Sequence, residues 1–162
     1  MTFENPSLVL SNIALFKGFS ATTIEELLNC AERRNIATGE FVVLADQLAG
    51  GLFVIISGTI DVLLTLPGGS QQQKIATLGS GDSIGELALV GVTRRSASVK
   101  AQTPVEVVFW STENFLNFMQ IHHEVGLDFF RNLSTVLARR LVTTDKHLSN
   151  ALYQNLYHFG QA

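Results

Sequence analysis

The sequence is poor in cysteine and in charged residues. Its 162 residues include a single cysteine, Cys30, so no internal disulfide can form and nothing requires an oxidising compartment. We expect Cys30 to be a small buried side chain on a helix. Charged residues make up only 15% of the chain, and the net charge of -3 disfavours a broad electrostatic surface for nucleic acid.

Long apolar runs are also missing. The longest, such as LFVII at 52–56, are far too short to cross a bilayer, and the first ten residues lack the basic start and apolar stretch of a signal peptide. We therefore expect no membrane segment and a cytoplasmic location. The apolar fraction of 46% indicates a folded chain, and the length of 162 residues predicts a single domain, 1–162.

Hydrophobic periodicity divides the chain into three regions. Apolar residues have helical spacing over 1–35, alternate in short runs between glycine-rich turns over 36–110, and return to helical spacing over 111–157. No helical crossover fits between the strands, so we do not expect a parallel sheet. The pattern predicts an α+β fold: an antiparallel β-roll of the double-stranded β-helix or jelly-roll type, with N-terminal helices and a long C-terminal helix.

Local signals place the ends of several elements. Thr22 or Thr23 is expected to cap an N-terminal helix, because acids follow each of them. PGGS at 67–70 is expected to be a turn between two strands. Ser111 is the expected cap of the first C-terminal helix, and the long helix is expected from about 127 to 157.

The long C-terminal helix carries an apolar stripe whose successive steps are seven, four, seven and four residues. Such spacing is close to that of a coiled-coil seam. Part of the helix is expected to pack on its own β-roll. The roll is too small to cover about 45 Å of helix, so we expect the second half to form a homodimer contact. The stripe consists of Phe130, Leu137, Leu141, Leu148 and Leu152.

The segment GDSIGELALVGVTRRSAS, 81–98, has the residue types that suit a nucleotide. Gly85 permits a close backbone approach, and the first amides of a helical turn after it suit an anion. Arg95 offers a forked cation for phosphate oxygens, and Ser96 adds a hydroxyl. Glu86 suits a sugar hydroxyl instead. The alternative is a surface ion pair, which would contribute little.

This segment resembles the phosphate-binding cassette of the cyclic nucleotide-binding domain family. The cassette runs Phe-Gly-Glu-Leu-Ala-Leu, a short gap, and then Arg-x-Ala-Thr-Val. Ile84 replaces the usual aromatic residue and Ser98 replaces the threonine. The similarity extends over about 13–152. The matching positions within the cassette are Gly85, Glu86, Leu87, Ala88, Leu89, Arg95, Ala97 and Val99.

The resemblance implies a role for each matching position. The carboxylate at Glu86 would bind the ribose 2′-hydroxyl, and Arg95 would bind the cyclic phosphate. The ligand implied is cAMP, with cGMP as the alternative, and no further cofactor. Arg94 stands where many relatives have proline, and we expect it to be solvated. The pocket would be completed by the backbone amides of Gly85, Leu87 and Ala97 and by Ser96.

The C-terminal helix is similar to the long helix of the bacterial catabolite activator family. The resemblance over LARRLVTTDKHLSNALYQNL implies that Thr144 meets the adenine amino group, partly across a dimer. The alternative is a hydroxyl bonded to its own helix carbonyl. Asp145 stands where the activator has serine, which is a departure from that pattern.

These observations predict a sensor module rather than an enzyme. No nucleophile–base pair or metal-ligand set is visible; adjacent residues such as His122 and His123 point about 100° apart on a helix. The activator continues into a helix-turn-helix domain. This sequence ends at Ala162, so we expect no DNA binding and leave the downstream effector open. The alternative function is an interaction or dimerisation module of the same fold with a degenerate or different effector site.

Overall fold

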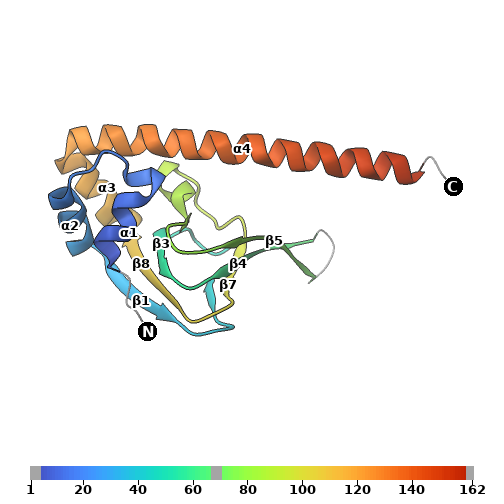
Figure 1. The fold of residues 1–162 in the computed structure, drawn as a ribbon, viewed down its shortest axis with the longest axis horizontal. Helices are drawn as coiled ribbons and strands as arrows, with labels where there is room; N and C mark the ends of the chain where they lie inside the picture. The colour runs from blue at the N-terminus through green and yellow to red at the C-terminus, as the bar shows by residue number, and fades with distance from the viewer. Residues whose placement is uncertain (1–4, 67–70, 160–162) are drawn as a thin grey trace.

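The computed structural model describes residues 5–66 and 71–159. Two four-stranded antiparallel sheets form a roll, helices cover one end of it, and a long helix lies along one side (Figure 1). The predicted fold class is therefore confirmed. The strands are β1 (Glu32–Ile36), β2 (Phe41–Val43), β3 (Gly51–Ser57), β4 (Ile60–Thr65), β5 (Gln72–Leu78), β6 (Ser83–Ile84), β7 (Ser98–Ala101) and β8 (Val105–Ser111).

The two sheets enclose an apolar interior. One sheet has the strand order β1-β8-β3-β6 and the other the order β2-β7-β4-β5. Strands β3 and β8 are buried on both faces, and their successive side chains pack alternately into the roll core and into a second apolar cluster under the helices. The predicted turn at 67–70 lies outside the described residues, but the strands on either side of it, β4 and β5, pair antiparallel. The roll core includes Phe53, Ile55, Ile60, Val99, Val107 and Phe109.

The first strand begins earlier than the sequence predicted. The boundary between helices and roll was expected at 35/36, whereas β1 already pairs with β8 from Glu32 onward. The polar sequence ERRNI conceals this strand because its side chains are held by charge and stacking rather than by apolar burial. Arg33 forms an ion pair with Glu106 of β8, and the Arg34 guanidinium lies 3.8 Å from the ring centroid of Phe109.

The N-terminal helices differ from the prediction in two local details. The N-terminal cap of helix α2 (Ala21–Asn29) is Ser20, whose Oγ accepts a hydrogen bond from the Thr23 amide at 3.1 Å. The expected cap at Thr22 or Thr23 was therefore wrong. Cys30 is exposed because the helix ends before it. The elements are α1 (Pro6–Asn12), the 3-10 helix η1 (Ala14–Phe16) and α2 (Ala21–Asn29).

A second apolar cluster joins the helices to the roll. We call it the helical core; its large fully buried side chains include Phe16, Trp110, Phe115 and Phe129. The indole N–H of Trp110 donates to the carbonyl oxygen of Leu27 at 2.8 Å, which ties β8 to α2. This cluster fixes one end of the roll against the C-terminal helices.

The C-terminal helices are α3 (Thr112–Ile121) and α4 (His123–Phe159). The predicted cap is confirmed, because Ser111 Oγ accepts a hydrogen bond from the Asn114 amide at 3.1 Å. α4 begins at His123, four residues before the prediction. Gly126 allows this early start: a Cβ atom there would lie 2.9 Å from the carbonyl oxygen of Met119, so only glycine lets α4 pass this close to α3.

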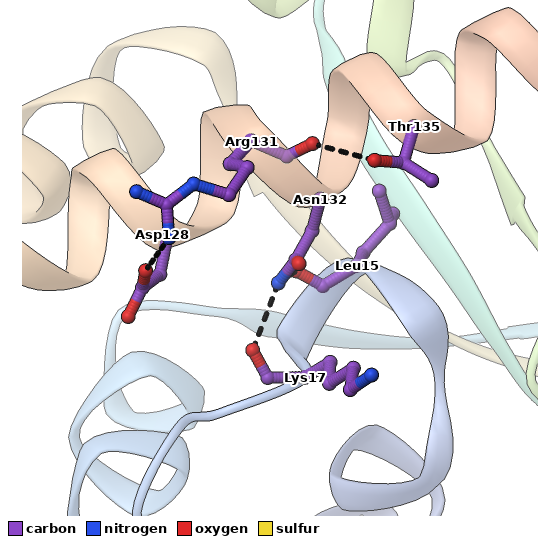
Figure 2. A network of polar contacts seen from close by, with 6 residues as sticks. All are labelled: Leu15, Lys17, Asp128, Arg131, Asn132 and Thr135. Atoms are coloured by element: carbon purple, nitrogen blue, oxygen red, sulfur yellow. Dashed lines mark hydrogen bonds and ion pairs between the residues drawn. The ribbon is translucent and has the colours of Figure 1, made fainter.

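The N-terminal half of α4 is anchored on η1. Figure 2 shows the Asn132 side chain pointing from α4 toward the N-terminal segment, where its amide donates to the carbonyl oxygens of Leu15 at 3.2 Å and Lys17 at 2.8 Å. In the same view Arg131 pairs with Asp128, both on α4. The anchor fixes this half of the helix relative to the roll.

The C-terminal half of α4 extends beyond the roll (Figure 1). Phe130 and Leu137 pack against the helical core, as expected for the first half of the stripe. Leu141, Leu148 and Leu152 are 63%, 57% and 55% exposed. None of the helices in the described part of the chain is long and apolar enough to cross a membrane.

Candidate ligand-binding site

The candidate site is built where β6 ends and a short helix begins. Gly85 takes a left-handed conformation, with φ of 84°, directly after β6. The predicted helical turn follows it as the 3-10 helix η2 (Glu86–Val90). A second left-handed glycine, Gly91, ends η2 and starts the loop that leads to Arg95. Two glycines therefore turn the chain out of the sheet and back toward it.

The loop that carries Arg95 is fixed by backbone hydrogen bonds to the segment between β2 and β3. The Arg95 amide donates to Gln47 O at 2.9 Å, and the Asp46 amide donates to Arg95 O at 2.9 Å. The preceding Arg94 is exposed, as expected, and its Nη1 donates to Asp46 O at 2.5 Å. Arg95 therefore enters the site from an ordered loop, whereas the Arg94 side chain lies outside it.

The Arg95 guanidinium is buried beside Gly85. Arg95 is only 8% exposed, its Nη2 donates to Gly51 O at 3.0 Å, and its Nε has no partner among the described residues. Burial lowers the pKa of Arg95 from its usual value, because desolvation disfavours the charged form. A Cβ atom at position 85 would collide with Arg95 Nη1 and with Gly51 O, so glycine is required there for space as well as for φ.

The Glu86 carboxylate is buried and half-paired. Glu86 is 4% exposed; its Oε1 accepts a hydrogen bond from Arg140 of α4, while its Oε2 has no partner among the described residues. Arg140 Nη2 also donates to the carbonyl oxygen of Ser83 at 3.2 Å. Desolvation lowers the pKa of Arg140, and the negative charge of Asp82 opposes that shift. The C-terminal helix thus reaches the cassette through Arg140.

Sequence reasoning missed Arg140. The only available signal was its position in the Ala-Arg-Arg-Leu segment, one helical turn before Thr144. Nothing in the local pattern distinguishes Arg140 from Arg139, because the partner carboxylate lies 54 positions away in the sequence. Thr144 itself is exposed, and its hydroxyl donates to Arg140 O of its own helix at 3.0 Å.

The other predicted site residues lie at the ends of the same loop. Leu87 is half-buried at the start of η2, and its carbonyl oxygen accepts a hydrogen bond from the Val92 amide at 3.0 Å. Ser96 is exposed and Ala97 is half-buried, between Arg95 and β7. The structure therefore places Gly85 against Arg95 and Glu86 against Arg140, with Thr144 farther along α4.

The arrangement suits a ligand that has both an anionic group and a hydroxyl. Buried polar atoms in proteins are nearly always paired, so an unpartnered guanidinium nitrogen and an unpartnered carboxylate oxygen in one cassette point to a group that completes them. The guanidinium suits phosphate oxygens, and the carboxylate suits a hydroxyl donor. Within the described residues no group of three or more His, Cys, Asp or Glu side chains could hold a metal ion.

Comparison with known proteins gives related sequences and folds. The chain is 32% identical over 139 residues to Glutaminase 2 of Bradyrhizobium diazoefficiens, covering 86% of this chain and 21% of that protein. It is 30% identical over 134 residues to the Cyclic AMP receptor protein of Thermus thermophilus, covering 83% of this chain and 60% of that protein. The crystal structure of the Thermus thermophilus Catabolite Activator Protein has a TM-score of 0.74 and 29% identity, covering 84% of this chain and 62% of that one.

These two relatives are longer proteins, of which this chain spans about a fifth and three fifths. A match to the cyclic nucleotide-binding domain, which covers residues 33–122, lies over the roll and includes the whole cassette. The resemblance seen in the cassette and the fold of the roll agree with that match. The chain therefore belongs to the cyclic nucleotide-binding domain family.

Proposed function

We propose that this chain is a cyclic nucleotide sensor whose ligand is cAMP, with cGMP as the alternative. The observation that carries the proposal is the pair of buried, unpartnered atoms in the cassette, Arg95 Nε and Glu86 Oε2. The cyclic phosphate would accept hydrogen bonds from Arg95, and the ribose 2′-hydroxyl would donate to Glu86. These groups bind and orient a nucleotide but supply no attacking water, so the proposal includes no catalysis.

Ligand binding is proposed to act on α4 through Arg140. Glu86 is the group shared between the cassette and the helix, because one of its oxygens already pairs with Arg140. A ribose hydroxyl that donates to the same carboxylate would weaken its attraction for Arg140 and shift the position of its oxygens. A ligand can favour one position of α4 over another only if it binds the two arrangements with different affinities. The Glu86–Arg140 contact is where that difference in affinity would arise.

The exposed part of the α4 stripe is proposed to pair with the same helix of a second copy. Leu141, Leu148 and Leu152 are each more than half exposed, beyond the part of the helix that packs on the helical core. Self-pairing gives a two-fold contact, the commonest symmetric solution. The same exposure favours the second candidate function, an interaction or dimerisation module with a different effector.

The preference for cAMP over cGMP rests on Thr144. Its hydroxyl hydrogen is used by Arg140 O, which leaves oxygen lone pairs to accept from an adenine amino group. Ser96 beside the phosphate position could serve a guanine amino group, and it is the residue that favours cGMP. The net charge of -3 disfavours any contact of this chain with DNA.

Calorimetric titration of the wild-type chain with cAMP, cGMP and 5′-AMP tests the proposal. We expect saturable one-site binding of cAMP and weaker binding of cGMP. We expect 5′-AMP to bind weakest, because its phosphate does not form the ring that places phosphate and ribose side by side. Absence of binding to either cyclic nucleotide would remove the sensor function and leave the interaction module.

A further inference from the structure

The buried charge of Arg95 has no carboxylate partner. Among the described residues no Asp or Glu oxygen lies within ion-pair distance of its guanidinium, although Arg95 is only 8% exposed. The one hydrogen bond that its side chain makes to a described residue goes to a neutral acceptor, Gly51 O. A buried cation is costly unless it is paired and hydrogen-bonded, and attraction to the face of an aromatic ring offsets only part of that cost. What faces Arg95 therefore decides how its guanidinium is oriented.

Strand β3 supplies two groups that hold the Arg95 guanidinium. Gly51, whose carbonyl accepts from Arg95, and Phe53 are two positions apart in the strand. The Cζ atom of Arg95 lies over the Phe53 ring, 5.5 Å from its centroid, within the range of cation–π attraction. Phe53 is 4% exposed, so the contact is shielded from water.

The Phe53 ring is itself held in place. Phe109 lies directly opposite on β8, and the two ring centroids are 4.5 Å apart. The Arg34 guanidinium covers Phe109 at 3.8 Å from its centroid and lies 5.7 Å from that of Phe53. Four side chains therefore stack in a row from the edge strand β1 to the cassette, in the order Arg34, Phe109, Phe53 and Arg95. Phe53 has little freedom to turn away from Arg95.

We propose that Phe53 is a positioning residue that orients the Arg95 guanidinium toward the anionic group of the ligand. This inference rests on the proposed function in naming the ligand as a cyclic nucleotide. The face of the ring attracts the cation without neutralising it, whereas a carboxylate in this place would compete with the phosphate. The carbonyl of Gly51 holds Nη2, the ring covers one face, and Nε is left for the ligand.

Two variants of Phe53 distinguish the effect of its aromatic ring from the effect of its size. Phe53→Leu keeps an apolar side chain but removes the ring, and a trifluorinated phenylalanine at the same position keeps the ring but weakens the negative charge of its face. We expect each to lower cAMP affinity by about three- to tenfold, as loss of a partly desolvated cation–π contact predicts. Phe115→Leu is the matched control: a buried phenylalanine of the helical core, expected to lose stability but not affinity.

A second background shows whether Phe53 acts through Arg95. In the Arg95→Ala background, where weak binding requires titration at higher concentration, we expect Phe53→Leu to change cAMP affinity by less than about twofold. The reason is that the effects of two substitutions do not add when one residue acts through the other. An equal loss in both backgrounds would mean that the ring contacts the nucleotide directly and would overturn the positioning role.

A measurement without nucleotide decides the inference independently of the proposed function. The Arg95 Nε–H resonance of the ligand-free protein is expected upfield, because the ring shields it. Phe53→Leu is expected to move the resonance downfield. The fluorinated variant, whose ring still shields but attracts the cation less, is expected to move it part of the way. An unmoved resonance together with wild-type cAMP affinity in Phe53→Leu would overturn the inference. Failure of the wild type to bind any cyclic nucleotide would instead overturn the proposed function, and the resonance would still report whether Phe53 orients Arg95.

Discussion

Gly85, Glu86 and Arg95 of the candidate site make contacts that differ in kind. Gly85 leaves room for the guanidinium, Arg95 is held by a carbonyl and a ring, and Glu86 connects the cassette to α4. The cassette positions could be predicted from the sequence because they are contiguous and of distinctive types. Arg140 and Phe53 could not, because each belongs to an ordinary helical or strand pattern and meets the cassette only in the folded chain.

The two left-handed glycines of the cassette allow a matched comparison. Gly85→Ala is expected to lower cAMP affinity by about tenfold or more, because its Cβ would displace Arg95 and Gly51. Gly91→Ala has a similar φ of 94° but no atom within 4 Å of the new Cβ. It is expected to cost about 1 kcal/mol of stability and to leave affinity within about twofold. Urea denaturation and calorimetry measure both; equal affinities for the two variants would refute the steric role of Gly85.

Glu86 is predicted to distinguish ribose from deoxyribose. The wild type is expected to bind cAMP more tightly than 2′-deoxy-cAMP, because the 2′-hydroxyl completes the unpartnered Oε2. In Glu86→Ala the two nucleotides are expected to bind with affinities within about twofold of each other. Competition titrations measure the ratio. Glu106→Ala, which removes a buried glutamate paired with Arg33 away from the cassette, is the control and is expected to keep the wild-type ratio.

At the scale of elements, α4 consists of an anchored half and an extended half. Asn132 ties the first half to η1 with two hydrogen bonds, and the second half leaves the roll (Figure 2 and Figure 1). Periodicity predicted the helix and the division of its stripe. It did not predict the strand at Glu32–Ile36, because the two arginines of β1 owe their roles to β8, which is distant in sequence. It did not predict the start at His123 either, because the close approach of α3 and α4 at Gly126 appears only in the folded chain.

Asn132→Ala is expected to loosen this anchor. It leaves the carbonyl oxygens of Leu15 and Lys17 without their partner, and we expect a loss of about 1 to 2 kcal/mol in the free energy of unfolding. Thr135→Ala is the control, because Thr135 Oγ1 donates to Arg131 O of its own helix, and its loss is expected to change stability by less than about 0.5 kcal/mol. Urea denaturation with equal midpoints for both variants would show that the anchor is not stabilising.

At the scale of the whole molecule, the part of α4 that leaves the roll carries a group of exposed apolar side chains: Leu141, Val142, Leu148, Leu152 and Tyr153. The low charge content already indicated that such surface would exist, and the coiled-coil spacing indicated which helix carries it. The spacing could not say where the roll stops covering the helix, since that depends on the size of the roll and on the anchor at Asn132. The boundary falls between Leu137, packed on the helical core, and Leu141, which is 63% exposed.

Introducing charged residues on this surface tests whether it forms the dimer contact. Leu141→Glu combined with Leu148→Glu is expected to convert a dimer into a folded monomer in sedimentation experiments, because like charges would face each other across the two-fold axis. Leu127→Glu, on the anchored half and 69% exposed, is the control and is expected to remain dimeric. A wild type that is monomeric at tens of micromolar with and without nucleotide contradicts the proposal, and a dimeric double variant moves the interface elsewhere.

The central claim, that the cassette binds the phosphate of a cyclic nucleotide through Arg95, is tested most directly by comparing two adjacent arginines. Arg95→Ala and Arg94→Ala remove the same charge, but the Arg95 side chain is 8% exposed beside Gly85, whereas the Arg94 side chain is exposed and donates to Asp46 O. In calorimetric titrations with cAMP we expect Arg95→Ala to weaken binding by at least about 2 kcal/mol, roughly thirtyfold, and Arg94→Ala by less than about threefold. Equal affinities for the wild type and Arg95→Ala, or equal losses in the two variants, would contradict the assignment of the site.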